Sequence, residues 1–257
     1  MPTVHVNGID LYHEVSGNGD PVVFAHGAGG NHASWWQQVA DFSNTYQVIT
    51  FDHRGFGHSK DIHNGPGINA FADDLEALLE YLGIDQTFLV AQSMGGWTSL
   101  GFTVRHPNRV RALVMADTPG GIDDPSVHEI AREVAKTNQG KSLLERALPQ
   151  SFRDRCPEKT ELYTAIYGFN FPTPDTSGLR GTKVATAAQL KSLKVPILYL
   201  VGQEDISTPP NLIEAAHRLT PSSSYLEVPG AGHSVYFEKP EVFNYLVHQF
   251  LENLDIQ

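Results

Sequence analysis

The stretch Thr87-Phe88-Leu89-Val90-Ala91-Gln92-Ser93-Met94-Gly95-Gly96 decides the fold of this chain. Its first four residues predict a buried β-strand, and residues 97–106 predict a helix. A serine at a sharp strand-to-helix turn needs small residues two positions before and after it, because the strained backbone brings those positions together. Ala91 and Gly95 meet that need, although Ala91 adds one methyl group to the G-x-S-x-G pattern. Ser93 is therefore a candidate nucleophile, and the alternative is a serine in an ordinary strand-to-helix loop.

Two further polar residues follow predicted strands, in the order Ser, Asp, His that a triad on such a sheet requires. The apolar run 195–201 predicts a strand buried on both faces, and Asp205 comes just past its carboxyl end. A shorter strand at 225–228 leads into the Gly-rich residues 229–232, which lets a loop carry His233 to the same edge of the sheet. Glu204 and Asp117 are the alternatives for the acid.

In combination these segments resemble the α/β-hydrolase family over nearly the whole chain. Two further segments carry the resemblance: His26-Gly27-Ala28-Gly29-Gly30 after a strand at 22–25, and Asp52-His53-Arg54-Gly55-Phe56-Gly57-His58-Ser59 after a strand at 48–51. We interpret His26 as a residue that bonds the backbone and fixes its loop.

The resemblance implies Ser93 as nucleophile, His233 as base and Asp205 as acid. It also implies an oxyanion hole made by the backbone N–H groups of Ala28 and Met94. These residue types suit acyl transfer, because a serine hydroxyl needs a neutral imidazole to take its proton. A buried carboxylate then holds the imidazole in the correct tautomer, and fixed donors stabilise the charge on the carbonyl oxygen.

Strand and helix patterns alternate along most of the 257 residues. A hairpin around Asn7-Gly8 precedes helical patterns at 69–82, 97–106, 210–219 and 240–253, which favours an α/β fold with a mostly parallel central sheet flanked by helices. In the first of these helices the apolar residues share one face, so we interpret its carboxylates as a solvated face.

The alternation breaks after the sixth strand, where two or three helical patterns are separated by Gly and Pro. This insertion resembles the helical cap of the family. We therefore expect a hydrolase core at 1–118 and 192–257, with a cap at 119–191 that supplies the walls of the substrate pocket. Aromatic side chains before and within the cap are the candidate pocket walls, or they only pack the cap on the core: Trp35, Phe152, Tyr163, Tyr167, Phe169 and Phe171. Trp97 is assigned to the core.

Composition limits the partners of the protein. The net charge of −11 gives no basic footprint for nucleic acid or anionic lipid, and a neutral ligand is expected. One cysteine, Cys156, forms no internal disulfide, and the first residues read as a strand without an export signal. With no apolar stretch near the roughly twenty residues that span a bilayer, we expect a cytoplasmic protein without membrane contact.

Twelve histidines invite metal hypotheses, yet neither H-E-x-x-H nor paired cysteines occur, so no metal and no cofactor are expected. The sequence thus predicts a serine hydrolase for a small, neutral, fairly apolar carboxylic ester or lactone. A carbon–carbon bond hydrolase, an acyl transferase or a perhydrolase with the same triad are alternatives. A ligand sensor on a hydrolase scaffold is another. The sequence leaves the oligomeric state, including a homo-oligomer, open.

Overall fold

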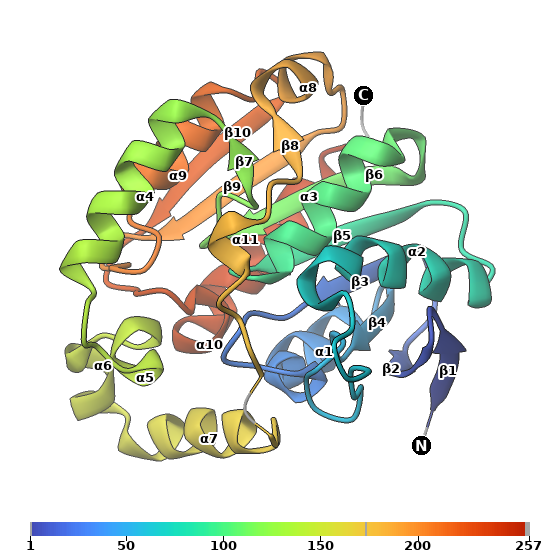
Figure 1. Ribbon diagram of the computed structural model, residues 1–257, viewed down its shortest axis with the longest axis horizontal. Coiled ribbons are helices and arrows are strands. Elements are labelled where there is room, and N and C mark those ends of the chain that lie inside the picture. The colour runs from blue at the N-terminus through green and yellow to red at the C-terminus, as the bar shows by residue number, and fades with distance from the viewer. Residues whose placement is uncertain (1, 173, 255–257) are drawn as a thin grey trace.

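The computed structural model describes residues 2–172 and 174–254, and across these residues eight strands form one sheet in the order β1-β2-β4-β3-β5-β6-β9-β10 (Figure 1). The strands are β1 (Thr3–Val6), β2 (Ile9–Ser16), β3 (Pro21–Ala25), β4 (Gln47–Phe51), β5 (Thr87–Gln92), β6 (Val110–Ala116), β9 (Ile197–Gly202) and β10 (Ser223–Val228). The β1–β2 hairpin and the β2–β4 pair are antiparallel, and the pairs from β4 to β10 are parallel. The predicted fold class is confirmed.

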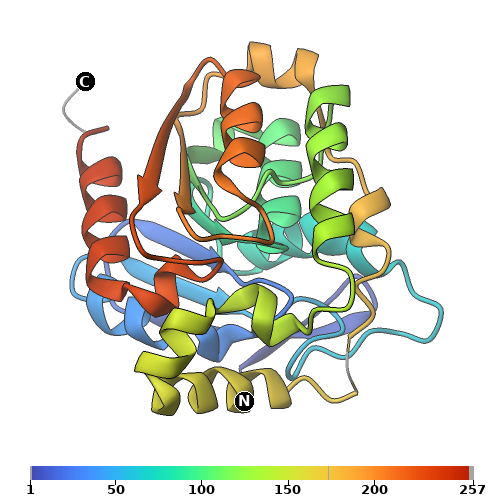
Figure 2. The ribbon, with the colours of Figure 1, turned by 90° about the vertical axis from the view of Figure 1, so that its left-hand side faces the viewer.

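Helices cover both faces of this sheet (Figure 2). The helices of the core are α1 (Trp36–Phe42), α2 (Phe71–Tyr81), α3 (Gly95–Arg105), α9 (Pro210–Arg218), α10 (Val235–Glu238) and α11 (Pro240–Glu252), with the 3-10 turns η1 (His32–Trp35), η2 (Gly67–Ala70) and η3 (Pro107–Arg109). In β5 the side chains of Phe88 and Val90 join the apolar cluster of α1 and α11, while Leu89 and Ala91 join that of α2, α3 and α9. Because both faces are buried, the strand reads as an unbroken apolar run.

The turn between β5 and α3 holds Ser93 with φ of +49°, a backbone conformation that is costly for a residue with a side chain. The glycines after it allow close approach. A Cβ on Gly95 would lie 2.1 Å from the carbonyl oxygen of Ala25, and one on Gly96 would lie 2.4 Å from Thr118 Oγ1. Ala91, two residues before the serine, is fully buried within the strand, so its extra methyl group is accommodated.

The insertion after β6 holds five α-helices within the described residues, more than the two or three patterns that the sequence predicts. They are α4 (Pro125–Thr137), α5 (Leu143–Ala147), α6 (Gln150–Arg155), α7 (Pro157–Gly168) and α8 (Ala187–Ser192), with the short strands β7 (Ile122–Asp123) and β8 (Ala185–Thr186) and the 3-10 turn η4 (Leu179–Gly181). Helices as short as α5 and α6 carry too few turns for a clear periodicity.

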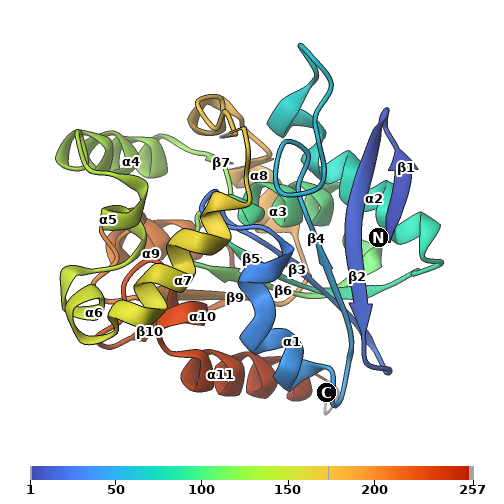
Figure 3. The same cartoon turned by 90° about the horizontal axis from the view of Figure 1, so that it is seen from below.

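The five helices of the insertion do not act as one layer. Helix α4 packs on α9 and so extends the helix layer of the core, whereas α5, α6 and α7 lie together across one edge of the sheet (Figure 3). The edge that they cross is the one at the carboxyl ends of the parallel strands, as contacts between α7 and η1 indicate. The division into a core at 1–118 and 192–257 and a cap at 119–191 stays a prediction.

Hydrogen bonds fix the carboxyl end of α7 to the loops after β3 and β4. Asn170 donates from Nδ2 to the carbonyl of Gly30 at 3.0 Å and accepts the N–H of Gly57 at 2.8 Å. Asn31 donates to the carbonyl of Ile166 at 2.8 Å. The side chains of Asn31 and Asn170 are both buried, so these contacts are protected from water.

The carboxylates of α2 are not all solvated, which corrects the sequence interpretation. Asp74 is buried and accepts two hydrogen bonds of 2.6 Å from the guanidinium of Arg54, in the loop after β4. Asp74 also accepts a bond of 3.0 Å from Asn7 in the β1–β2 hairpin. Periodicity alone cannot reveal this pair, because the partners come from other elements.

Candidate active site

Three side chains from separate strand ends form a hydrogen-bonded chain at the carboxyl edge of the sheet. His233 Nδ1 lies 2.8 Å from Asp205 Oδ2, and its Nε2 lies 2.9 Å from Ser93 Oγ. Because a carboxylate accepts only, Nδ1 carries the proton and Nε2 is free to accept the hydroxyl hydrogen. The structure therefore brings together the three residues that the sequence predicts as the triad.

The carboxylate of Asp205 is buried and held by its own loop. Its Oδ1 accepts the N–H of Ser207 at 2.7 Å and that of Thr208 at 2.9 Å. The Thr208 hydroxyl lies 2.7 Å from Asp205 Oδ2 and 2.8 Å from the carbonyl of Asp117, so its single hydrogen serves one of them at a time. These bonds aim Oδ2 at His233.

The two alternative acids lie elsewhere. Glu204 is exposed and accepts a bond of 3.2 Å from the Ser151 hydroxyl. Asp117 is buried, and its carboxyl accepts the N–H of Gly202 at 3.0 Å and that of Val235 at 3.4 Å. Burial and the nearby charge of Asp205 raise the pKa of Asp117 well above its ordinary value. Asp117 thus joins the ends of β6 and β9 to the loop of His233.

Two side chains that the sequence interpretation missed fix the backbone around His233. Gln92 donates from Nε2 to the carbonyl of His233 at 2.7 Å. Glu238, in α10, accepts the N–H of Gly232 at 2.9 Å and that of Ser234 at 3.1 Å, the residues on either side of His233. Burial raises the pKa of Glu238 to about 7. The only sequence signal for Glu238 is its position five residues after the histidine, in the same loop and helix.

The loop after β3 lies directly against the Ser93 turn. A Cβ on Gly27 would lie 3.1 Å from Ser93 Cβ, so Ala28 follows a residue in van der Waals reach of the serine. Within residues 2–172 and 174–254, the backbone N–H groups of Ala28 and Met94 donate to no acceptor. Both donors are therefore free for a substrate oxygen.

His26 holds this loop through both ring nitrogens. Its Nδ1 lies 2.8 Å from the carbonyl of Gly27, and its Nε2 accepts the N–H of His53 at 3.0 Å. Burial lowers the pKa of His26 to about 4, which keeps the ring neutral. Since a neutral ring with a protonated Nδ1 can make both bonds, the expected loop-fixing role is confirmed.

Two of the predicted pocket walls are core residues instead. Trp35 is fully buried, with its ring centroid 5.0 Å from that of Phe24 and 4.7 Å from that of Tyr236. Phe152 is buried against Phe237 at 6.4 Å between ring centroids. Trp35 packs η1 against β3 and α10, and Phe152 packs the cap against α10, so a packing role accounts for both side chains.

The aromatic residues in and just after α7 differ in burial according to their place on the helix. Tyr163 and Ile166 form its buried face, and a Cβ on Gly29 would lie 2.7 Å from the Tyr163 hydroxyl. Tyr163 therefore covers the loop after β3. Tyr167 is only half-buried, and Phe169, beyond the end of the helix, is 65% exposed. Neither Tyr167 nor Phe169 lines the cavity described next, and Phe171 is exposed as well.

Trp97 departs from its assignment to the core. It lies on α3 but is only half-buried, and its indole N–H donates to the carbonyl of Thr182 at 2.9 Å. The tryptophan thus fixes the end of the insertion to the core helix.

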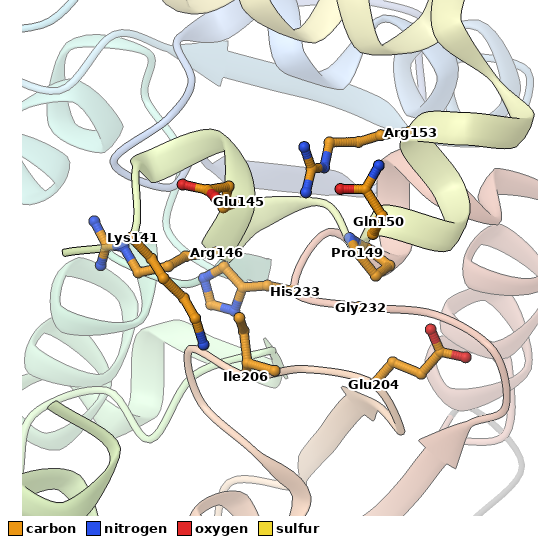
Figure 4. Close-up of a pocket in the computed structure, with 10 residues that line it drawn as sticks. All are labelled: Lys141, Glu145, Arg146, Pro149, Gln150, Arg153, Glu204, Ile206, Gly232 and His233. Carbon is orange, nitrogen blue, oxygen red and sulfur yellow. The ribbon is translucent and has the colours of Figure 1, made fainter. Parts of the chain in front are cut away.

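A cavity of about 240 Å³ opens beside His233, between the cap and the loops that follow β9 and β10 (Figure 4). Figure 4 shows Lys141, Glu145 and Arg146 on one side and Gln150 and Arg153 on the other, with His233 between them. Pro149, Glu204, Ile206 and Gly232 complete the lining. Half of these ten side chains carry a charge.

Among the residues that the structure describes, no helix is both long and apolar enough to cross a bilayer. Clusters of three or more His, Cys, Asp or Glu side chains with the arrangement of a metal site are likewise absent from that part of the chain.

A model of the alpha/beta hydrolase fold family matches residues 20–240. The chain belongs to the α/β-hydrolase family. It is similar to a thermophilic esterase from Thermogutta terrifontis, solved with malate bound, at 29% identity and a TM-score of 0.81, over 98% of this chain and 97% of that one.

A second similar structure is Est816, described as an N-acyl homoserine lactone degrading enzyme, with 26% identity and a TM-score of 0.82 over 97% of this chain and all of the other. A 2-hydroxy-6-oxo-2,4-heptadienoate hydrolase from Pseudomonas putida is 30% identical over 96% of this chain and 95% of its own length. The protein is thus a hydrolase whose homologues include esterases and lactonases.

Proposed function

We propose that this protein is a serine hydrolase that opens small carboxylic esters or lactones through an acyl-enzyme intermediate. The observation that carries the proposal is the continuous chain from Ser93 through His233 to Asp205, with distances of 2.9 and 2.8 Å. Such a chain supplies a nucleophile, a base within hydrogen-bond reach and a group that orients the base.

In the first half of the reaction, His233 Nε2 takes the hydroxyl proton as Ser93 Oγ attacks the carbonyl carbon. The imidazolium that forms is stabilised by Asp205, which stays ionised. The tetrahedral oxyanion accepts hydrogen bonds from the N–H groups of Ala28 and Met94. His233 then gives its proton to the leaving alkoxide, and the acyl group remains on Ser93.

In the second half, His233 takes a proton from a water molecule, which attacks the acyl carbon. The second tetrahedral intermediate collapses, and the proton on Nε2 returns to Ser93 Oγ as the carboxylic acid leaves. For a lactone the alcohol and the acid belong to one molecule, so ring opening yields a single hydroxy acid. No cofactor enters either step.

Ester or lactone cleavage is favoured because the similar structures include an esterase and an enzyme described as degrading N-acyl homoserine lactones. A carbon–carbon bond hydrolase, an acyl transferase and a perhydrolase would use the same three residues. The expectation of a neutral, fairly apolar substrate stays a prediction, because both charged and apolar residues line the cavity beside His233.

Replacement of the nucleophile tests the proposal. Wild type, Ser93→Ala and, as a matched control, Ser126→Ala in the exposed first turn of α4 are assayed with short p-nitrophenyl esters and simple lactones. We expect Ser93→Ala to lose about 10⁶ in turnover, as a serine protease loses with its nucleophile. Activity above about a hundredth of wild type in Ser93→Ala contradicts the proposal.

Labelling and turnover number separate the enzyme from a sensor. A fluorophosphonate labels wild type and Ser126→Ala but not Ser93→Ala if Ser93 is the activated hydroxyl. Product release over many turnovers per site supports the enzyme, whereas a single burst with retained product supports the ligand sensor.

A further inference from the structure

The cavity beside His233 carries three cationic side chains, Lys141, Arg146 and Arg153. Across residues 2–172 and 174–254 none of the three forms an ion pair with a carboxylate. Lys141 donates to Asn138 Oδ1 at 3.2 Å, and Arg153 Nε donates to the carbonyl of Leu148 at 3.2 Å. Their positive charges are therefore not neutralised by a direct partner.

Arg146 shows the strongest sign of a missing partner. Its Nε is buried, and no acceptor lies within hydrogen-bond distance among the described residues. A buried donor without an acceptor costs about 1–3 kcal/mol, so such groups usually have a ligand or another partner. Arg146 also lines the cavity, and its guanidinium makes no side-chain hydrogen bond or ion pair among the described residues. A carboxylate in the cavity would be bound through the terminal amino groups of Arg146, because the buried Nε is closed off from solvent.

The two acidic side chains of the lining have partners of their own. Glu145 closes the amino end of α5, where its Oε2 accepts the N–H and the hydroxyl of Ser142 at 2.8 and 2.7 Å. Glu204 accepts the Ser151 hydroxyl at 3.2 Å. Both carboxylates keep their charge, and Glu145 interacts electrostatically with Arg153 and Lys141. The lining therefore holds three cations against two anions, an excess of one positive charge.

The walls of the cavity are fixed to the acid loop. Ser207 lies two residues after Asp205, and its hydroxyl donates to the carbonyl of Arg146 at 3.0 Å. Asn138, at the end of α4, donates to the carbonyl of Ile206, which itself lines the cavity. These contacts hold the cations beside His233 and limit the rearrangement that binding requires.

We propose that this cavity binds a carboxylate on the substrate, so that the preferred ester or lactone carries an anionic group on its acyl or its alcohol part. The inference rests on the proposed function, since His233 lines the cavity and touches Ser93 Oγ. The net charge of −11 repels anions only over long range, and at about 0.1 M salt such repulsion is screened within about 10 Å.

Two pairs of esters test the proposal. p-Nitrophenyl glutarate is compared with p-nitrophenyl hexanoate, in which an ethyl group replaces the carboxylate. 4-Acetoxybenzoate is compared with its methyl ester, which places the charge on the alcohol part. The readout is the ratio of kcat/KM between the anionic and the neutral member of each pair, so the intrinsic reactivity of each ester cancels between protein variants.

The variant is Arg146→Gln/Arg153→Gln, and the control is Arg132→Gln/Arg155→Gln, which removes two exposed charges of α4 and α6 that do not line the cavity. We expect the ratio for at least one pair to fall about 10- to 100-fold in the cavity variant, the loss of one or two charge-assisted bonds. The ratio should stay within about two-fold in the control.

The outcomes separate the two proposals. If wild type hydrolyses the esters and the kcat/KM ratio falls equally in both double variants, or falls in neither, the carboxylate site is overturned. The proposed function then stays intact. If wild type hydrolyses no ester, the proposed function fails, and calorimetry with glutarate decides the site. The carboxylate site is supported if wild type and the control bind glutarate at millimolar concentration and the cavity variant does not. It is overturned if wild type does not bind glutarate, or if the cavity variant binds it as well as the control does.

Discussion

Asp205 and Asp117 follow neighbouring strands of the sheet, and the difference between them lies in what their oxygens contact. Asp205 Oδ2 faces His233 Nδ1 at 2.8 Å. The two oxygens of Asp117 accept the backbone N–H groups of Gly202, at the end of β9, and of Val235, at the start of α10. One carboxylate can therefore orient the imidazole, whereas the other positions the loops that carry the acid and the base.

Substitution by Asn distinguishes these roles. In Asp205→Asn the amide favours the wrong imidazole tautomer, and we expect kcat on an ester to fall by about 10³–10⁴. Asp117→Asn keeps an acceptor for one N–H and should cost far less, and Glu204→Gln serves as the exposed control. If Asp117→Asn loses most of its kcat while Asp205→Asn keeps nearly all of it, the acid is Asp117 at the end of β6, and the triad proposed above is wrong.

At this scale the sequence predicted the residues whose chemistry is unusual for their setting. Ser93 stands out because small residues surround it at a strand end, and His233 because glycines precede it. Gln92, Thr208 and Glu238 could not be predicted in the same way, because they act through hydrogen bonds to backbone atoms of other loops. Such bonds depend on how the loops meet in space, which residue type and spacing do not specify.

Helix α2 is joined to two other elements through one buried carboxylate. Asp74 pairs with Arg54 from the loop after β4 and with Asn7 from the β1–β2 hairpin. The neighbouring Asp73 pairs with Arg105 on α3, and both of these side chains are largely exposed. The two acids are adjacent in the sequence, yet Asp74 is almost completely buried and Asp73 is exposed.

Loss of each charge should reflect that difference. We expect Asp74→Asn to lower the free energy of unfolding by about 3 kcal/mol, because the buried Arg54 loses its bidentate partner and keeps only the contact of 3.2 Å with Asp61. Asp73→Asn should change it by less than about 1 kcal/mol, as exposed pairs do. Urea unfolding of both variants measures the two values, and equal losses would show that burial of the Arg54–Asp74 pair carries no special weight.

The core strands and helices were predictable from the sequence because their burial repeats along the chain. The continuous apolar run of β9 and the apolar face of α2 are examples. The insertion was less predictable, since α5 and α6 have fewer than seven residues each. Helix α7 presents Tyr163 to the core, whereas Phe169, just past its end, is exposed. Aromatic residues there predicted pocket walls, whereas none of the residues that line the cavity beside His233 is a Phe, Tyr or Trp, and half of them are charged.

Over the whole molecule, buried carboxyls concentrate at the carboxyl edge of the sheet. Asp117, Asp205 and Glu238 lie close enough that their charges affect one another. Burial is the main cause of the raised pKa of Asp117 and of Glu238, and the neighbouring charge of Asp205 adds to it. The fold therefore places two carboxyls that are costly to ionise, Asp117 and Glu238, beside the proposed catalytic groups, and the stability of the molecule should depend on pH.

Glu238 gives this dependence a sign and a size. Its pKa rises from an ordinary 4.5 to about 7 in the folded protein, so between these values the folded state binds more protons than the unfolded state. The free energy of unfolding therefore falls as pH rises through this window, by about 3 kcal/mol at 1.36 kcal/mol per pKa unit. This cost is fully present above pH 7 and absent well below pH 4.5.

A neutral side chain at position 238 should remove that slope. We expect Glu238→Gln to gain stability relative to wild type as pH rises from about 5 to 8, since Gln has no proton to release and still accepts one of the two N–H groups. Urea unfolding of both proteins at several pH values measures the difference, with the exposed Glu241→Gln as control. Because burial, which both proteins share, is the main cause of the raised pKa of Asp117, most of its contribution cancels between them. A difference between Glu238→Gln and wild type that stays constant over this range would show that Glu238 is already ionised in the folded protein at pH 5, and that its bonds to Gly232 and Ser234 outweigh its burial.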